Sequence, residues 1–220
     1  MTEIWKGRAA TLAARPSALN FSNYRSAVLY NLRQSYTPPL EPYEFNDRAI
    51  IIDTETVGSG VTVEVVEVAL CDHAGEVIYS SLVRPLYGRP PRLTKEQRFD
   101  PGQFATAPDW VEAWSRIKPL VAGKLLVAYN AAFDRRALAA MRSRHHQRSA
   151  ERGWRCAMQM VKRAAGVTRS LSLSDACALY ELEGGTHRAA ADVLATHRLL
   201  KRLCETHTHW RTAPSASPRR

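Results

Sequence analysis

The spacing of hydrophobic residues predicts three consecutive strands in the first half of the chain. Residues 49–52 form a short apolar run that is mostly β-branched, which is typical of a strand buried on both faces. Two further strands are expected at residues 61–70 and 77–83. The sequence Asp-His-Ala-Gly at residues 72–75, between them, is typical of a hairpin turn.

The pattern becomes helical after residues 85–108, a proline-rich segment that is expected to be mostly loop. Asp109 is expected to cap a helix, and Thr186 to cap the last helix of the domain. The helix after Asp109 would bury Trp110, Trp114, Ile117 and Val121 on one side. Between the two caps we expect a strand at residues 125–129 and helices at 133–144, 158–165 and 174–182. Three strands followed by alternating elements predict one α/β domain with a mixed sheet.

This domain is expected to span residues 47–206. Residues 1–46 read as an N-terminal extension, in which residues 22–36 have helical spacing before prolines end it. Residues 207–220 are rich in Ser, Pro and Arg and are expected to be a disordered basic tail.

Charge and composition narrow the class of protein. The 220 residues carry a formal net charge of +10, which favours a polyanionic partner such as nucleic acid, although an arginine-rich proteome explains it equally well. No apolar run approaches the roughly 18 residues that span a bilayer, and the N-terminus has no secretory h-region. The four cysteines are far apart and form no Cys-x-x-Cys pair, which indicates a reducing cytoplasm.

Two carboxylates follow the first apolar run. Asp53 and Glu55 are two residues apart, so on a strand their side chains project to the same face. No Lys or Arg lies in residues 50–60 to neutralise them, and adjacent carboxylates at a buried strand end favour a shared divalent cation. A strand end that opens into solvent is the alternative.

Two later acids and one histidine extend this set. Asp134 follows an apolar strand at the start of a helix, where a favourable interaction with the helix N-terminus is the alternative explanation. Asp192 would face inward among alanines, where an unpaired carboxylate needs a partner. His187 precedes it next to two glycines and suits proton abstraction near neutral pH. Four further histidines are expected to be ordinary surface residues: His73, His145, His146 and His197.

The three acidic segments together resemble the motifs of the DEDDh exonucleases. This family includes the proofreading subunit of bacterial DNA polymerase III, ribonuclease T, oligoribonuclease and exonuclease X. The similar stretches are residues 51–56 (IIDTET), 127–134 (VAYNAAFD) and 187–192 (HRAAAD), and the likeness runs from about residue 46 to 204. Their order and surroundings make the combination far more specific than any one of them.

The resemblance implies an α/β, ribonuclease H-like fold with a mixed five-stranded sheet flanked by helices. It implies that Asp53, Glu55 and Asp192 bind one divalent metal ion, Mg²⁺ or Mn²⁺, and that Asp53 bridges to a second. Asp134 would hold the second ion directly or through water. His187 would be the general base of a two-metal mechanism that removes nucleoside monophosphates from a 3′ end.

By the same resemblance, four residues are expected to contact the substrate end: Thr56, Val57, Asn130 and Phe133. Val57 stands where a second threonine is frequent in the family, and Tyr129 replaces a common histidine. Residues 98–101 (RFDP) lie where relatives often carry a His-Gly pair that touches substrate. These differences leave every expected metal ligand in place, but they affect the expected substrate contacts.

Single-stranded DNA is the favoured substrate, because a pocket that acts on an end needs an unpaired terminus and the motif flanks resemble the proofreading and exonuclease X branch. The expected role is DNA repair or proofreading. The alternatives are an exoribonuclease that trims RNA and a non-catalytic adaptor for a polymerase or repair complex. A candidate phosphate track, for which a solvated surface is an equally good explanation, comprises Arg142, Arg144, Arg148, Arg152, Arg155, Lys162 and Arg163.

Overall fold

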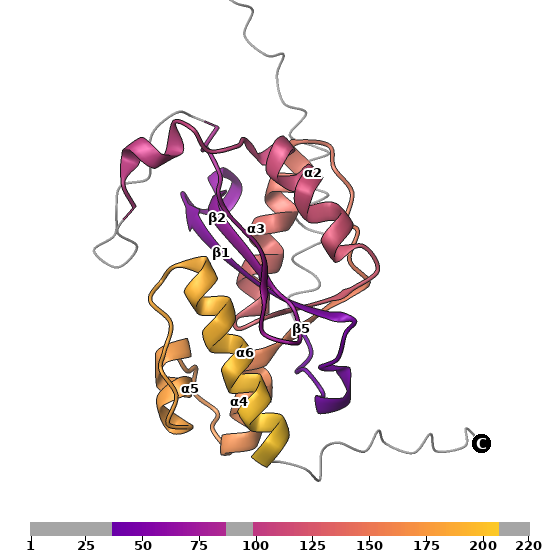
Figure 1. The fold of residues 1–220 in the computed structure, drawn as a ribbon, viewed down its shortest axis with the longest axis vertical. Helices are drawn as coiled ribbons and strands as arrows, with labels where there is room; N and C mark the ends of the chain where they lie inside the picture. Colours follow the sequence, from indigo (N-terminus) through magenta and orange to yellow (C-terminus); the bar gives the residue numbers. More distant parts are fainter. Residues whose placement is uncertain (1–36, 87–98, 207–220) are drawn as a thin grey trace, which may run out of the picture.

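The computed structural model describes residues 37–86 and 99–206 (Figure 1). The expected helix at residues 22–36 and the expected tail at 207–220 lie outside the described residues. The division between extension and domain at residue 46 therefore stays a prediction. No helix within the described ranges has the length and apolar character needed to cross a membrane.

A mixed five-stranded sheet forms the centre of the described structure, in the order β3-β2-β1-β4-β5. Neighbours β1, β2 and β3 are antiparallel, whereas β4 runs parallel to both β1 and β5. The strands are β1 (Ala49–Val57), β2 (Glu64–Cys71), β3 (Val77–Leu82), β4 (Leu125–Ala128) and β5 (Gly153–Cys156). The expected mixed sheet is confirmed.

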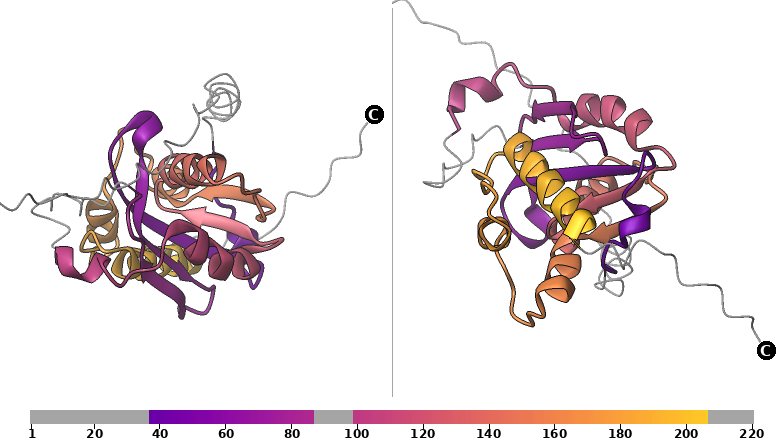
Figure 2. Two further views of the ribbon diagram at one scale, coloured as in Figure 1. Left: turned by 90° about the horizontal axis from the view of Figure 1, so that it is seen from above. Right: turned by 60° about the horizontal axis from the view of Figure 1, so that its bottom comes forward.

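Side chains of the central strand β1 enter two hydrophobic cores on opposite faces, as its β-branched composition predicts. Ile50 and Ile52 pack in a core shared with α2 (Trp110–Val121) and α3 (Ala131–Arg144). Ile51 packs in a second core, which is closed by α4 (Ala157–Ala165), α5 (Leu173–Leu179) and α6 (Ala189–Thr206). Figure 1 shows these two groups of helices, and the right view of Figure 2 shows α6 lying across the strands.

Local polar contacts fix the element boundaries. Asp109 accepts a hydrogen bond from the backbone N–H of Glu112 at 2.9 Å, so the expected cap of α2 is confirmed. Asp72 Oδ1 accepts from the backbone N–H groups of Ala74, Gly75 and Glu76, which confirms the turn between β2 and β3. These contacts satisfy backbone donors that the regular elements leave unpaired.

Three boundaries differ from expectation. Residues 60–62 form a short 3₁₀ helix instead of strand, because the backbone N–H and the hydroxyl of Thr62 both donate to the carbonyl of Ser59. The expected last helix begins at Ala189, and Thr186 does not cap it but donates its backbone N–H to Asp192. Strand β5 was not expected and lies in the basic stretch after α3.

Residues 37–46 pack onto the domain beside β5. The backbone N–H of Leu40 donates to the carbonyl of Cys156, and the N–H of Cys156 donates to the carbonyl of Pro38. The Leu40 side chain is fully buried in the core that α6 closes. Pro38 and Leu40 therefore contact β5 and the core, although the sequence places them in the extension.

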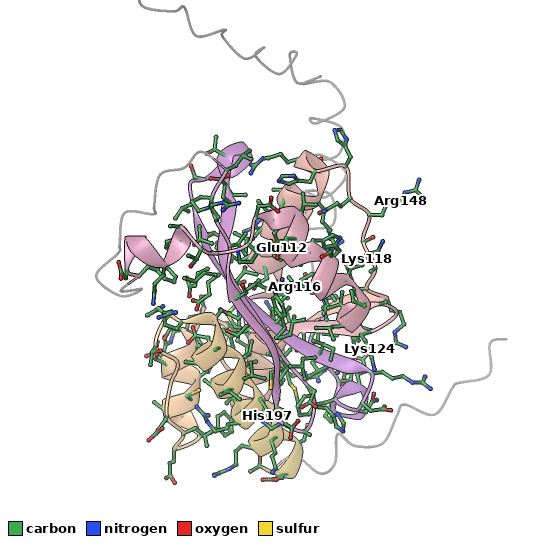
Figure 3. All side chains as sticks on the ribbon, turned by 45° about the horizontal axis from the view of Figure 1, so that its top comes forward. Glu112, Arg116, Lys118, Lys124, Arg148 and His197 are labelled. Atoms are coloured by element: carbon green, nitrogen blue, oxygen red, sulfur yellow. The ribbon has the colours of Figure 1, made fainter. Side chains whose placement is uncertain are left out.

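His197 corrects one expectation about the histidines. Its side chain lies on α6 near the β2–β3 turn, where Nε2 is 3.0 Å from the carbonyl oxygen of His73 (Figure 3). Only 7% of its surface is exposed, and a Cβ on Gly75 would lie 2.8 Å from its ring. His197 is thus a packed core residue rather than a surface residue, whereas His73 and His146 are exposed.

Candidate active site

Three carboxylates converge where β1 passes the first turn of α6. Asp53 and Glu55 project to the same side of β1 because they are two residues apart. Asp192 lies in the first turn of α6. One ligand oxygen from each of these three side chains lies within 4.8 Å of the other two, which is a suitable spacing for oxygens around one cation.

The approach of α6 to the strand depends on Gly185 and Thr186. A Cβ on Gly185 would overlap Asp192 Oδ1, so only glycine leaves room for the carboxylate at that place. The backbone N–H of Thr186 donates to the same oxygen at 2.9 Å. Burial raises the pKa of Asp192, and the hydrogen bond from Thr186 and the charge of His187 partly offset this.

Asp134 lies beside this cluster, in the first turn of α3, and is 3% exposed. Its Oδ1 accepts two hydrogen bonds from Thr54, at 3.0 Å from the backbone N–H and at 2.9 Å from the hydroxyl. Burial raises its pKa to about 7 despite these bonds. Asp134 is therefore hydrogen-bonded to Thr54, which lies between Asp53 and Glu55. The group of three converging carboxylates does not include Asp134.

The pKa of Asp53 is raised well above its usual range. Burial is the largest cause, and the neighbouring carboxylates of Asp134, Asp192, Glu55 and Glu67 follow in that order. Four acids around one carboxylate are unfavourable without a compensating positive charge. A donor set made only of carboxylate oxygens fits a hard divalent cation such as Mg²⁺ or Mn²⁺.

A buried ion pair next to the carboxylates was not expected from the sequence. Glu67 lies directly opposite Glu55 on β2 and is 3% exposed. Arg188 donates from Nε and Nη2 to its carboxylate at 2.9–3.1 Å, and the backbone N–H of Ala189 donates at 3.1 Å. The guanidinium of Arg188 also lies 5.0 Å from the ring centre of Phe99. No local pattern pointed to this pair, because Glu67 is a single polar position within an apolar part of β2.

His187 immediately precedes this ion pair and is exposed. Its backbone φ of +56° lies in the left-handed region, which is uncommon for a residue other than glycine. The charge of His187 and a hydrogen bond from its backbone both lower the pKa of Asp192, so this residue lies beside that carboxylate. The structure thus brings the expected histidine to the edge of the acidic group.

The expected substrate-contact residues lie at the end of β1 and at the start of α3. Thr56 and Val57 are half-buried at the end of β1, after an irregularity in the pairing between Glu55 and Thr56. Asn130 is exposed at the N-cap position of α3, and Phe133 is 40% exposed in its first turn. An exposed aromatic ring near a carboxylate cluster is available for stacking.

Tyr129, which replaces a common histidine of the family, has a structural role. Its hydroxyl lies within hydrogen-bond distance of two carbonyl oxygens, at 3.1 Å from Leu171 and 2.9 Å from Ser172. Burial raises its pKa further above its usual range. Tyr129 therefore fixes the segment before α5 against the end of β4.

Four arginines of the candidate phosphate track form ion pairs within the domain, which favours a structural role for them over phosphate binding. Arg142 binds Glu151 at 2.7 Å, and both side chains are nearly inaccessible. Arg144 lies 3.5 Å from Glu64, Arg155 binds Glu44 at 2.6 Å, and Arg163 binds Glu41 at 2.7 Å. These arginines neutralise buried or half-buried acids, which a count of charges along the sequence cannot reveal. Arg148 and Arg152 are exposed, and Arg148 lies at the periphery in Figure 3.

Comparison with known proteins identifies the family. The family model RNase_T, described as exonuclease, matches residues 50–200. An uncharacterized exonuclease, CP81 of Escherichia phage 186, is 34% identical over 90 residues, which cover 41% of this chain and 46% of the phage protein. The match thus spans about half the length of this relative.

Solved structures share the fold at low sequence identity. One, described as 3′-end specific recognition of histone mRNA stem-loop by 3′-exonuclease, is 16% identical with a TM-score of 0.59, over 84% of this chain and 72% of that chain. The nuclease domain of 3′hExo, a DEDDh family member bound to rAMP, is 16% identical with a TM-score of 0.58, over 72% and 92%. Pop2p of S. pombe in its Mg²⁺- and Mn²⁺-bound form is 12% identical with a TM-score of 0.52, over 89% and 93%.

These likenesses confirm the expected ribonuclease H-like fold. The family match covers more than half of the chain, and the motif acids are all present in order. The chain therefore belongs to the RNase_T family of exonucleases and is a member of the DEDDh type.

Proposed function

We propose that this chain is a metal-dependent 3′–5′ exonuclease that removes nucleotides from the 3′ end of single-stranded DNA. The observation that carries the proposal is the convergence of Asp53, Glu55 and Asp192 within 4.8 Å in a member of an exonuclease family. Loss of these acids would be expected in a non-catalytic adaptor, so their presence together favours an enzyme.

The four acids would hold two divalent ions, Mg²⁺ or Mn²⁺. Asp53, Glu55 and Asp192 would bind one ion, and Asp134 together with Asp53 would bind the other. When bound, such ions lower the pKa of the attacking water and stabilise the charge on the phosphate and the leaving 3′-oxygen. The raised pKa values of Asp53 and Asp134 fit this role, because a cation would compensate the crowded negative charge.

His187 would accept the proton of the attacking water. Its exposed position beside Asp192 leaves the imidazole accessible to substrate and solvent. Histidine is the side chain best suited to exchange a proton near neutral pH, which fits the role of a general base. Replacing it by alanine should lower kcat by about 10²-fold or more, as for other general bases.

Four residues would position the terminal nucleotide. Phe133 offers an exposed ring for stacking on a base, and stacking of this kind tolerates any base. Asn130 is an exposed amide on the same turn, and Thr56 and Val57 would border the nucleotide from the end of β1. Such contacts require an unpaired end, which is why we propose a single-stranded substrate.

The preference for DNA rests on the resemblance of the motif flanks to proofreading exonucleases. We propose a role in DNA repair or proofreading from the same resemblance. We propose a cytoplasmic location from the wide spacing of the cysteines. One similar structure is described as recognising the 3′ end of histone mRNA and another as bound to rAMP, and these observations favour RNA trimming as the second candidate.

Matched DNA and RNA strands of one sequence distinguish the two candidates. With 5′-labelled strands and either Mg²⁺ or Mn²⁺, we expect a higher kcat/KM for the DNA strand than for the RNA strand. Faster trimming of RNA would assign the enzyme to RNA and leave its chemistry unchanged. If neither strand is shortened with either metal, the adaptor role becomes the better explanation.

A further inference from the structure

The ion pair between Glu67 and Arg188 lies next to the acidic cluster, yet its carboxylate is fully engaged. Glu67 accepts hydrogen bonds from Nε and Nη2 of Arg188 and from the backbone N–H of Ala189. Its side chain is only 4% exposed. Because both oxygens are occupied by donors on one short segment, Glu67 is suited to hold that segment and not to bind a cation.

Arg188 connects three parts of the site. Its guanidinium pairs with Glu67 of β2 and also lies 5.0 Å from the centre of the buried ring of Phe99. Its backbone carbonyl accepts from the N–H of Asp192 at 3.0 Å, so the same residue starts the turn that presents Asp192. The planar fork of an arginine fixes both the direction and the distance of the segment it holds.

His187 precedes Arg188 directly and has a left-handed backbone φ of +56°. A residue with a side chain keeps this conformation only when its surroundings fix it, and such residues cluster at functional sites. Arg188 and Ala189, the next two positions, both donate to Glu67, and the carbonyl of Arg188 also accepts from Asp192. The backbone of His187 itself donates to the Asp192 carboxylate.

We propose that Glu67 and Arg188 are positioning residues for His187, which hold its backbone in the left-handed conformation so that the imidazole faces the acidic cluster. The inference rests on the proposed function, in which His187 accepts a proton. Neither Glu67 nor Arg188 needs to touch the reacting atoms. A base that is displaced by about 1 Å can lose up to 10²-fold in rate, so a purely geometric role is large enough to measure.

A double-mutant cycle in the full chain tests this inference. We expect Arg188→Ala to lower kcat by about tenfold while KM and the affinity for Mn²⁺ stay within about twofold. In a His187→Ala background, the same substitution should change kcat by less than about twofold, because the residue it positions is gone. Arg188→Lys keeps the charge without the fork, and we expect a kcat between those of Arg188→Ala and the unmodified chain.

Arg163→Ala is the matched control. Arg163 also forms an ion pair with a glutamate, at 2.7 Å, and its side chain is 41% exposed against 40% for Arg188. We expect this variant to keep its kcat within about twofold, since the Glu41 pair lies outside the site. Thermal unfolding of each variant shows whether the fold persists. If Glu67→Gln does not fold because of its buried position, the Arg188 variants still decide the question.

If Arg188→Ala lowers kcat by the same factor with and without His187, the inference is overturned, because the ion pair would then act independently of the histidine. Weakened Mn²⁺ binding in Arg188→Ala would also overturn it, since the pair would then support the carboxylates instead. Both results leave the proposed function intact. If His187→Ala itself keeps full kcat, the role of the base fails, and an inactive unmodified chain overturns the proposed function as well.

Discussion

Asp134 on α3 accepts both the backbone N–H and the hydroxyl hydrogen of Thr54 on β1 with one carboxylate oxygen. Thr54 stands between Asp53 and Glu55, so this double contact sets the distance between the helix and the two strand carboxylates. The contact is buried, and a hydrogen bond to a buried carboxylate contributes more to the free energy of unfolding than one at the surface.

Replacing Thr54 by valine should therefore destabilise the domain and weaken the site. The change keeps the shape but leaves Asp134 with one hydrogen bond fewer, which costs about 1–3 kcal/mol of unfolding free energy. Urea unfolding measures this loss. Thr206→Val is the control, because among the described residues the hydroxyl of Thr206 bonds to carbonyls in the last turn of α6, and we expect a change within about 0.5 kcal/mol. Equal effects in both variants would contradict the special role of Thr54.

The raised pKa of Asp134 predicts how stability depends on pH. Its folded pKa of about 7 lies above the ordinary value of 3.8, so the folded protein binds the proton more tightly than the unfolded chain. The stabilisation from this proton is complete below pH 3.8 and is lost as the pH rises through about 7. In EDTA, the free energy of unfolding should fall between pH 5 and pH 8, and Asp134→Asn should flatten that part of the curve. An unchanged curve in the variant would show that Asp134 is not the group responsible.

The same linkage predicts the effect of metal. Divalent ions bind the ionised carboxylates, so they compete with protons for Asp53 and Asp134. Addition of Mg²⁺ or Mn²⁺ should raise the unfolding temperature more at pH 8 than at pH 6. Differential scanning fluorimetry at the two pH values checks this, and a larger rise at pH 6 would contradict the assignment.

Gly185→Ala should lower activity strongly without unfolding the domain. The added Cβ would overlap Asp192 Oδ1 and force the carboxylate away from Asp53 and Glu55. We expect kcat/KM to fall by about 10²-fold, in line with other changes in metal-ligand geometry, and Mn²⁺ binding to weaken in parallel. Gly153→Ala is the control, because its nearest neighbour would be Leu125 Cδ1 at 3.7 Å, an ordinary contact. Full activity in Gly185→Ala would show that Asp192 has room elsewhere.

Substitution of Arg142 tests whether the arginines of the basic stretch stabilise the fold or bind phosphate. Its buried pair with Glu151 predicts that Arg142→Ala destabilises the fold by about 3–5 kcal/mol, because Glu151 is left charged and buried. The exposed Arg148 should instead tolerate alanine within about 0.5 kcal/mol. Chemical denaturation of both variants gives the comparison. A small effect of Arg142→Ala would return this residue to the candidate phosphate contacts.

Strong local patterns were enough to predict most of the fold. The apolar run before Asp53 and the cap at Asp109 are signals carried by a few adjacent residues, and both elements lie where they were expected. Each acid of the site follows a strand or opens a helix, but it was the resemblance of the three segments together to the DEDDh motifs that singled these acids out as a set. Strand β5 was not predicted, because it has only four residues and lies in a polar stretch. Its place in the sheet depends on its pairing with β4.

The ion pairs could not be predicted, because their partners are far apart in the sequence. Glu67 and Arg188 are 121 residues apart and meet only through the packing of α6 on the sheet. Arg155 and Glu44 are 111 residues apart and meet through the segment beside β5. In each case the sequence shows a charge, and only the tertiary structure shows that the charge is already neutralised.

Asp53 and its neighbouring acids are proposed to bind the metal ions with which this enzyme shortens nucleic acid from the 3′ end. The direct measurement incubates 5′-labelled single-stranded DNA with the chain in Mg²⁺, Mn²⁺ or EDTA, beside an Asp53→Asn variant shown to be folded. We predict a ladder that shortens from the 3′ end with metal and is absent in EDTA and in the variant. Equal cleavage by Asp53→Asn, cleavage in EDTA, or release of the labelled 5′ end would contradict the account.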